Sequence, residues 1–310
     1  MNNAIKKVSI PIAGLVLALA AIGNLLVSYG EIYKNSFGVI SSIFLILLLI
    51  KIFMYPNSIS NDLDNPVIAS VAPTFSMAIM ILSTYINPFL PSLAYGLWIT
   101  GLIIHCILII YFTKKFILNF DIKKVFPSYF VVYVGIVVGS VTAPAFNALN
   151  LGQWLFWFGF ILYFLLLPVV IYRVFVVKST LEPALPTITI FAAPASLCLA
   201  GYMSVFPQKN MTIVWLLTSL SLVMLISVLL YMPKMLKLKF YPSYSAFTFP
   251  LVISAIAIKK TNAFFITIGQ EIPLFNYVVK VEEFLATAIV IYVLVRHINI
   301  ILLIILLIMA

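Results

Sequence analysis

Ten apolar stretches, each about 20 residues long, run through this 310-residue chain, and each is long enough to cross a bilayer as an α-helix. They cover residues 8–28, 36–54, 67–86, 92–112, 127–148, 153–173, 185–205, 212–231, 244–260 and 277–298. Only 8% of the residues are charged, whereas a soluble domain carries about 25%. The pattern predicts an all-α integral membrane protein with a single transmembrane domain over residues 1–310. We expect the apolar tail after residue 298 to extend the last helix.

Lysines and arginines are distributed unequally between the two sides that ten spans would create. One side, with both termini, holds 13 of the 18 basic residues, and the other holds Lys34, Lys209, Lys259, Lys260 and Lys280. Because basic segments stay in the cytoplasm, the asymmetry predicts cytoplasmic N- and C-termini in a multi-pass protein of the cell (plasma or inner) membrane. The net charge of +10 follows from this topology, so we expect no nucleic-acid partner. The first stretch, which follows Lys6 and Lys7, imitates a signal peptide, but we expect an uncleaved span.

Every second stretch contains a proline together with many small residues, while the stretches between them are bulky. The prolines are Pro11, Pro73, Pro144, Pro194 and Pro250. A proline within a helix removes one backbone hydrogen bond, and a membrane tolerates that loss where protein or water satisfies the freed carbonyl. Small residues alone would also be explained by close helix packing. Their coincidence with prolines in all five odd stretches predicts five helical hairpins, in which an inner ring of odd helices lines a central lumen and an outer ring faces lipid.

Residues of the odd stretches are the candidates for lining that lumen or for bending its helices. These candidates are Pro11, Gly14, Pro73, Gly139, Pro144, Pro194, Leu197 and Pro250. Phe249 is singled out as a pore gate because it directly precedes Pro250, which disfavours α-helical backbone at the residue before it. An aromatic ring in a narrow lumen would act as a plug and as a constriction that repels water. The alternative is an ordinary packed or lipid-facing ring, since the chain has 25 phenylalanines.

The chain contains no motif that indicates an enzyme. It has two histidines, no His-Glu-x-x-His sequence, no glycine-rich phosphate loop and no paired acids for hydrolysis. We therefore expect no catalytic residue, no metal site and no cofactor. Cys106 and Cys198 lie inside predicted spans, where we expect small packing residues rather than a disulfide. His105, also inside a span, is interpreted as a packed or hydrogen-bonded side chain.

Acidic side chains are nearly missing from the predicted spans, which bears on what the lumen transports. All eight acids lie in loops or near helix ends, and only Glu282 and Glu283 are placed where they could be partly immersed. Proton-driven carriers usually hold an acid within the membrane, and cation channels use acidic rings. An acid-free lumen suits passive movement of anions. Lys259 and Lys260 close the ninth stretch and could attract anions to an outer vestibule, although lysines at a membrane surface often only reach for water.

Several short motifs resemble one family of membrane proteins. They are Asn65-Pro66-Val67, Pro127-Ser128-Tyr129, Leu181-Glu182-Pro183, Ala193-Pro194-Ala195 followed by Tyr202, and Ala246-Phe247-Thr248-Phe249-Pro250. In order along the ten stretches, the chain is similar to the tellurite-resistance/dicarboxylate transporter (TDT) family, which includes bacterial TehA and the plant guard-cell slow anion channels. It departs from the family in two ways. Pro250 stands where bacterial relatives can have glycine, and the long N-terminal extension of the plant channels is absent, so we expect no kinase control by that route.

The resemblance implies a quasi-fivefold arrangement of the five hairpins around a pore, with one pore in each subunit of a homotrimer. It also implies that a phenylalanine of the ninth helix occludes the pore, and this position corresponds to Phe249. Activities in the family range from anion channels to carriers of malate and related acids. We therefore expect a passive anion channel or channel-like transporter of small inorganic or organic anions, embedded in the lipid bilayer. The alternatives are a proton-coupled carrier of C4-dicarboxylates such as malate and a tellurite-resistance-type membrane protein.

Overall fold

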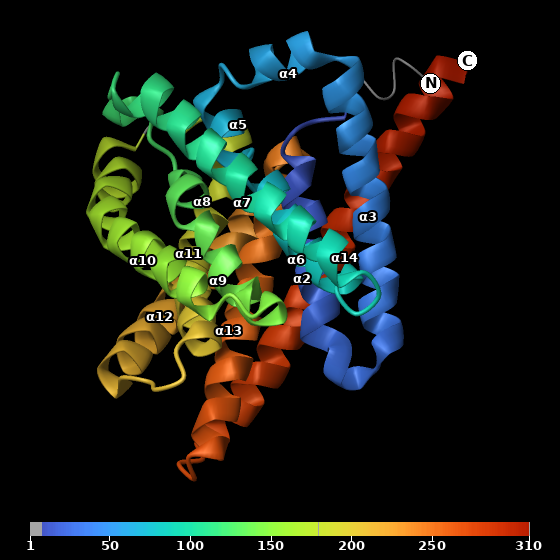
Figure 1. Ribbon diagram of the computed structural model, residues 1–310. Helices are drawn as coiled ribbons and strands as arrows, with labels where there is room; N and C mark the ends of the chain where they lie inside the picture. Colours follow the sequence, from blue (N-terminus) through green and yellow to red (C-terminus); the bar gives the residue numbers. More distant parts are fainter. Residues whose placement is uncertain (1–7, 179, 310) are drawn as a thin grey trace.

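The computed structural model describes residues 8–178 and 180–309, with side chains as far as residue 299 (Figure 1). Lys6 and Lys7 lie outside the described residues. The α-helices are α2 (Ile12–Leu26), α3 (Glu31–Met54), α4 (Pro56–Asp62), α5 (Pro66–Val71), α6 (Thr74–Ile86), α7 (Pro91–Phe112), α8 (Tyr129–Tyr133), α9 (Val138–Thr142), α10 (Leu149–Ile171), α11 (Ala193–Val205), α12 (Met211–Met235), α13 (Thr248–Thr267) and α14 (Pro273–Met309). Short 3-10 and π segments join them, and no strand occurs in this part of the chain.

Eight helical runs of the described chain are long and apolar enough to cross a membrane. They are Ile12–Tyr29, Glu31–Met54, Pro66–Ile86, Pro91–Ile117, Leu149–Val177, Glu182–Val205, Met211–Met235 and Pro242–Thr267. These runs coincide with eight of the ten predicted stretches and confirm an all-helical, multi-pass membrane protein. The complete set of ten spans in five hairpins stays a prediction.

The two remaining stretches are helical in a less regular way. The fifth is divided into α8, η4 (Gly135–Val137), α9 and η5 (Ala143–Phe146), because glycines and a proline interrupt regular helix. The tenth lies in α14, whose first turns carry Lys280, Glu282 and Glu283. The backbone of α14 continues to Met309, so the apolar tail extends the last helix as predicted.

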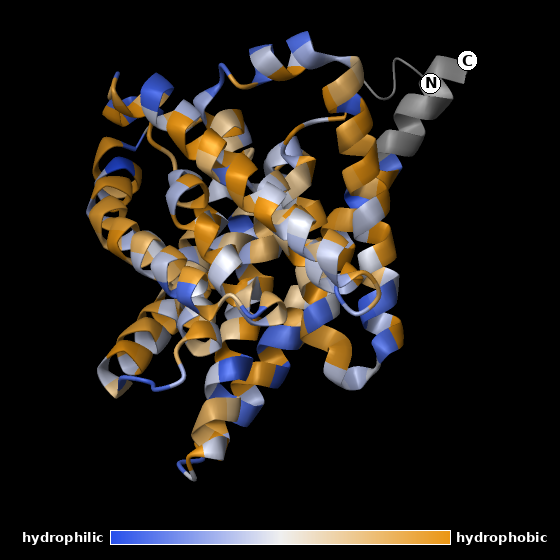
Figure 2. Ribbon diagram, in the orientation of Figure 1, coloured by the Kyte–Doolittle hydropathy of each residue, from blue (hydrophilic) through white to orange (hydrophobic). Residues whose placement is uncertain are grey.

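Burial alternates between consecutive helical runs. The odd runs are mostly buried, to an extent of 89% in Glu182–Val205, whereas the even runs are mostly exposed, with 17% buried in Leu149–Val177. In Figure 1, α3, α10 and α12 accordingly lie at the periphery and α13 runs through the middle. Figure 2 shows hydrophobic residues covering the peripheral helices. The alternation follows the sequence, because small residues let helix backbones approach closely while bulky apolar residues suit a surface that lipid covers.

The prolines of the odd stretches lie mainly at the starts of α-helices, which corrects the expectation of continuous helices bent near their middles. Pro11 and Pro73 immediately precede α2 and α6, while Pro194 and Pro250 lie in the first turns of α11 and α13. Pro144 instead stands within the 3-10 segment η5. The first N–H groups of a helix have no partner inside it, so a proline there removes no hydrogen bond.

The chain that precedes two of these helices is itself helical but of the tighter 3-10 type. Segment η7 (Glu182–Ala192) leads into α11, and η8 (Pro242–Phe247) leads into α13. Similarly, α5 leads into α6. The third, seventh and ninth stretches are therefore broken in two at the proline rather than smoothly bent.

Buried polar side chains fasten the inner helices to the outer ones. His105 on α7 contacts Ser76 Oγ on α6 through Nδ1 at 2.9 Å and the carbonyl oxygen of Val132 on α8 through Nε2 at 3.1 Å. Trp98 Nε1 on α7 donates to Thr142 Oγ1 on α9 at 2.8 Å. These bonds confirm His105 as a hydrogen-bonded packing residue. They hold the third and fifth stretches against α7. These two stretches form one wall of the space between the inner helices.

Candidate functional site

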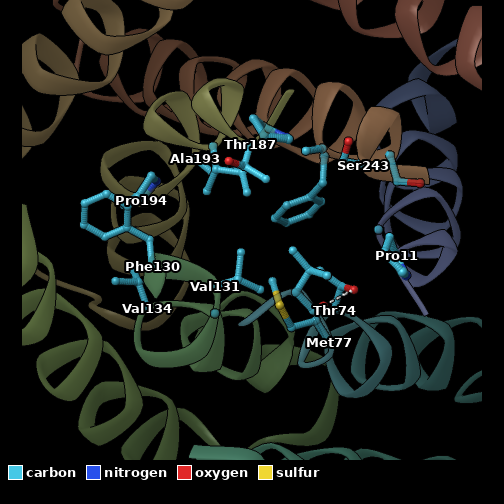
Figure 3. A pocket seen from close by; sticks show the side chains of 18 of the residues that line it. Pro11, Thr74, Met77, Phe130, Val131, Val134, Thr187, Ala193, Pro194 and Ser243 are labelled. Atoms are coloured by element: carbon cyan, nitrogen blue, oxygen red, sulfur yellow. Dashed lines mark hydrogen bonds between the residues drawn. The ribbon is translucent and has the colours of Figure 1, made fainter. Parts of the chain in front are cut away.

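A narrow cavity of about 60 Å³ lies between the inner helical segments, and we call it the proline cavity. All five odd stretches contribute to its wall. The lining residues include Pro11, Gly14, Thr74, Met77, Phe130, Val134, Thr187, Pro194, Leu197, Ser243, Phe249 and Pro250. Figure 3 shows the labelled side chains, among them Thr74, Thr187 and Ser243, arranged around the cavity. The odd stretches therefore surround a common space, as an inner ring of helices requires.

A second cavity of about 300 Å³, the lysine cavity, lies further along the same helices. Its lining residues are Ala21, Asn24, Ile81, Thr84, Val138, Val141, Thr142, Ala145, Phe249, Ile253, Ile256 and Lys260. Helices α2, α6 and α13 each pass from the proline cavity near their N-terminal ends to the lysine cavity further on. The step from Phe249 to Lys260 on α13 spans about 16 Å at the rise of an α-helix. The two cavities are thus stacked along the direction of these helices.

Phe249 lies at the boundary between the two cavities. Among the described residues that line them, Phe249 alone borders both. Its side chain is 6% exposed, and it stands in the first turn of α13. Thr248 Oγ1 donates to the carbonyl oxygens of Ser245 at 2.7 Å and of Gly14 on α2 at 3.3 Å, which anchors the start of α13. The ring is therefore held at a fixed level between two open spaces.

Phe247, two residues earlier, has a different environment. Its ring is completely buried and packs edge-to-face on Tyr244, with 4.9 Å between the ring centroids. It lines neither cavity in the described structure. Phe249 therefore borders open space, whereas Phe247 belongs to the packed core.

The proline cavity has an uncharged wall throughout its described lining. Its hydroxyl groups are directed to backbone carbonyls rather than to the open space. Thr74 Oγ1 donates to the carbonyl oxygen of Val71 at 2.7 Å, and Thr187 Oγ1 donates to that of Ala184 at 2.6 Å. With their protons engaged, these side chains offer an ion no strong donor. The cavity is therefore smooth and mostly apolar.

The lysine cavity carries a positive charge from Lys260. Lys209, in the loop before α12, lies close enough for its charge to act on Lys260. Burial lowers the pKa of Lys209 from its usual value. The sequence pattern marks Lys209 only as a member of the smaller set of basic residues.

Lys259 is directed away from the lysine cavity to which Lys260 belongs. Its Nζ pairs with Glu283 at 2.7 Å and donates to Ser28 Oγ at 2.7 Å and to the carbonyl oxygen of Leu25 at 2.9 Å. The structure thus separates the two lysines that the sequence placed together at a vestibule. Lys260 remains beside the open space, and the charge of Lys259 is compensated by an acid.

Three other candidates lie away from both cavities in the described structure. Pro73 precedes α6 at the break in the third stretch, and Pro144 lines a separate hollow beside Asn147. Gly139 packs against the outer helices, since a Cβ there would come within 2.8 Å of Leu102 and within 2.6 Å of Leu155. Pro11, Gly14, Pro194, Leu197 and Pro250 all border the proline cavity.

Two acids lie deeper than the sequence indicated. Glu282 and Glu283 on α14 are each only 5% exposed, whereas the sequence predicted at most partial immersion. Glu283 is satisfied by Lys259 and by Tyr29, whose hydroxyl donates to it at 2.7 Å. Neither carboxylate oxygen of Glu282 has a hydrogen-bond partner within the described structure. The sequence pattern does not predict this burial, because charged neighbours on α14 lower the mean hydropathy of the segment.

Comparison with known proteins agrees with the arrangement of the helices. The family model described as SLAC1, voltage-dependent anion channel, matches residues 7–298, which is nearly the whole chain. An uncharacterized transporter of Methanocaldococcus jannaschii is 28% identical over 262 residues, which cover 74% of this chain and 74% of the relative. These findings confirm the resemblance to the tellurite-resistance/dicarboxylate transporters and indicate a transporter rather than an enzyme. The chain belongs to the SLAC1 family of voltage-dependent anion channels.

Proposed function

We propose that this protein is a passive anion channel, or a channel-like anion transporter, whose lumen is occluded by the ring of Phe249. The observation that carries the proposal is the place of this ring at the boundary of two stacked cavities, both of which it borders. An aromatic ring at a constriction blocks ions sterically and also repels water. The proline cavity and the lysine cavity would then be the two halves of one interrupted pathway.

The charges along this pathway favour anions. Lys260 is the charged side chain that lines the lysine cavity, and the described walls of both cavities include no acid. A dicarboxylate carries two negative groups, which proteins usually hold with paired cations or with arginine in bidentate geometry. Lys259 is already compensated by Glu283, and Lys209, although near Lys260, lines neither cavity, so neither supplies a second free charge at the described wall. A small monovalent anion therefore fits the lumen better than a C4-dicarboxylate.

A second candidate is the proton-coupled carrier of C4-dicarboxylates such as malate. The observation that favours it is the buried carboxyl of Glu282, since acids within a membrane often relay protons. Glu282 borders neither cavity in the described structure, so a proton on it would not meet the transported ion directly. This separation is the reason for preferring the channel.

Orientation and assembly complete the proposal. The basic surplus on the side of both termini supports a cytoplasmic position for the N- and C-termini. The proline cavity would then open towards the cytoplasm and the lysine cavity towards the outside. We further infer ten spans in five quasi-fivefold hairpins and a homotrimer with one pore in each subunit, on the strength of the family to which the chain belongs.

The proposal is tested by reversal potentials in planar bilayers that contain the purified full-length chain. Phe249→Ala, which should conduct, is recorded beside wild type under a chloride gradient and then under an added proton gradient. A channel reverses near the chloride equilibrium potential, and the proton gradient leaves that potential unchanged. A reversal potential that moves with the proton gradient would establish the coupled carrier instead. Reversal near the cation potential would exclude both candidates.

A further inference from the structure

Helix α14 buries an acid that has no counter-ion among the described residues. Glu282 is 5% exposed, and both of its carboxylate oxygens are enclosed without a hydrogen-bond partner. The hydroxyl of Ser254 on α13 faces this carboxyl, and it too is enclosed without a completed hydrogen bond. A polar pair that lies across the contact between two helices, and that neither helix satisfies, needs a physical explanation.

No cation of the surrounding elements is available to Glu282 within the described structure. On α13, Lys259 is paired with Glu283 and Lys260 lines the lysine cavity. On α14 itself, Lys280 is exposed and His297 contacts Ser245 at 3.1 Å. Helix α2 contributes no titratable side chain, and the adjoining Tyr29 donates its hydroxyl to Glu283. Tyr244 of η8 donates its hydroxyl to the carbonyl oxygen of Leu238 at 2.6 Å.

An unpaired carboxylate is strongly disfavoured in such surroundings, and the neutral acid is not. Burial in a medium of low dielectric constant penalises the charged form, and the one hydroxyl that faces the carboxyl compensates little of that penalty. The close packing of α13 on α14 is therefore the arrangement expected when Glu282 carries its proton. Loss of the proton would favour any arrangement that gives the carboxylate water or a cation.

Helix α13, which carries Ser254, also carries Phe249. This shared helix connects the acid to the lumen. Ser254 and Phe249 are both part of α13, a continuous helix of 20 residues. They are separated by about 7.5 Å along its axis at the α-helical rise. A displacement of α13 at the level of Ser254 is therefore transmitted to the ring, because a helix moves as a rigid element over this distance.

We propose that Glu282 is a proton-binding site that controls the gate helix. The protonated acid keeps α13 packed on α14 with the Phe249 ring between the two cavities, and deprotonation loosens this contact and withdraws the ring. The proposal rests on the proposed occlusion of the lumen by Phe249. The proton acts at the contact between helices and is not carried along with the ion, so alkaline conditions raise the current without changing its reversal potential.

The test measures chloride current through the full-length chain in planar bilayers, with the same pH on both sides, from about pH 5 to about pH 9. We expect the wild-type current to rise about tenfold with pH, which corresponds to a change of about 1.4 kcal/mol in the closed-to-open balance. Glu282→Gln stays neutral at every pH and should keep the low current of the acidic wild type throughout. Glu271→Gln is the matched control, because it removes an exposed acid from the loop between α13 and α14. The current of this variant should depend on pH in the same way as that of wild type.

A second readout does not depend on current. Infrared difference spectra of the same samples should show the carbonyl band of a protonated carboxyl that disappears as the pH rises and that is missing in Glu282→Gln. Equal pH profiles of current in wild type and Glu282→Gln, or a band that persists over the whole range, would overturn the proton site.

The variant Phe249→Ala separates this proposal from the function on which it rests. Without the ring, α13 has nothing to withdraw, so the current should be high at every pH and Glu282→Gln should add no further effect. If Phe249→Ala conducts while the wild-type current ignores pH, the proton site alone fails. If wild type and Phe249→Ala are both silent at every pH, the occlusion itself fails, and the control by Glu282 fails with it.

Discussion

Replacing Phe249 with alanine tests the central feature of the lumen. The ring borders a cavity of about 60 Å³ on one side and a cavity of about 300 Å³ on the other. Alanine cannot fill the space that the ring leaves, so the substitution joins the two cavities. A closed protein typically populates its minor open state at about 0.1–10%, so permanent opening should raise anion conductance by about ten- to a thousandfold.

The effect on stability should be modest for a substitution of this size. Removal of a fully buried phenylalanine costs about 3–5 kcal/mol, because the ring is packed against neighbouring side chains on every side. The ring of Phe249 faces open space on two sides and is therefore less tightly packed. We expect Phe249→Ala to reduce the free energy of unfolding by about 2 kcal/mol. Thermal denaturation of the purified protein measures this cost, and bilayer recording measures the conductance.

Phe247→Ala, at the end of η8 and two residues before Phe249, provides the matched control. This ring is completely buried against Tyr244, so the variant should lose the full amount of about 3–5 kcal/mol and should not conduct more than wild type. The two variants therefore have opposite profiles in stability and in conductance. A folded Phe249→Ala variant that stays as silent as wild type would show that the ring is not the plug. The constriction would then be sought at other residues of the proline cavity, such as Leu197.

Three further predictions follow from other parts of the molecule. Lys260→Gln removes the charge that lines the lysine cavity and should lower anion conductance several-fold, most strongly at low salt because salt screens exposed charges. Its counterpart Lys259→Gln should mainly reduce stability. Recordings at two ionic strengths measure the conductance, and thermal melts measure the stability. Reporter fusions after Lys124 and after Lys239 should both report cytoplasm, and an external signal from either would refute the topology. His105→Ala removes two buried hydrogen bonds and should lower the free energy of unfolding by about 1–3 kcal/mol, measured by denaturation, without changing ion selectivity.

The sequence predicted the helices and their division into inner and outer sets. Hydropathy fixes which segments prefer lipid, and the contrast between small and bulky residues separates helices that other helices cover from helices that lipid covers. Hydropathy does not report where a helix begins, so Pro194 and Pro250 were interpreted as interior kinks although they lie in first turns. The backbone type before each proline, 3-10 in both cases, was not visible in the residue pattern.

The candidate site was predictable to a smaller extent. Phe249 was selected from its proline neighbour and from the resemblance, and the structure places it where both cavities meet. The different roles of Lys259 and Lys260 depend on a rotation of about 100° between successive helix residues and on which helix packs beside each. The burial of Glu282 depends in the same way on how α14 packs against α13. Neither fact is contained in a single stretch, because each arises from a contact between stretches.

The places where the inner helices begin have an electrostatic consequence. Helices α2, α6, α11 and α13 all start at the wall of the proline cavity. The N-terminal end of an α-helix carries a partial positive charge of about half an elementary unit. Three of these starts continue from the helical segments α5, η7 and η8, so among the four only the start of α2 is a free N-terminal end beside the cavity. The partial charge at the start of α2 comes from the backbone, so pH does not titrate it and neutralising a lysine does not remove it, and we expect the proline cavity to keep part of its preference for anions when the lysine cavity has lost its charge.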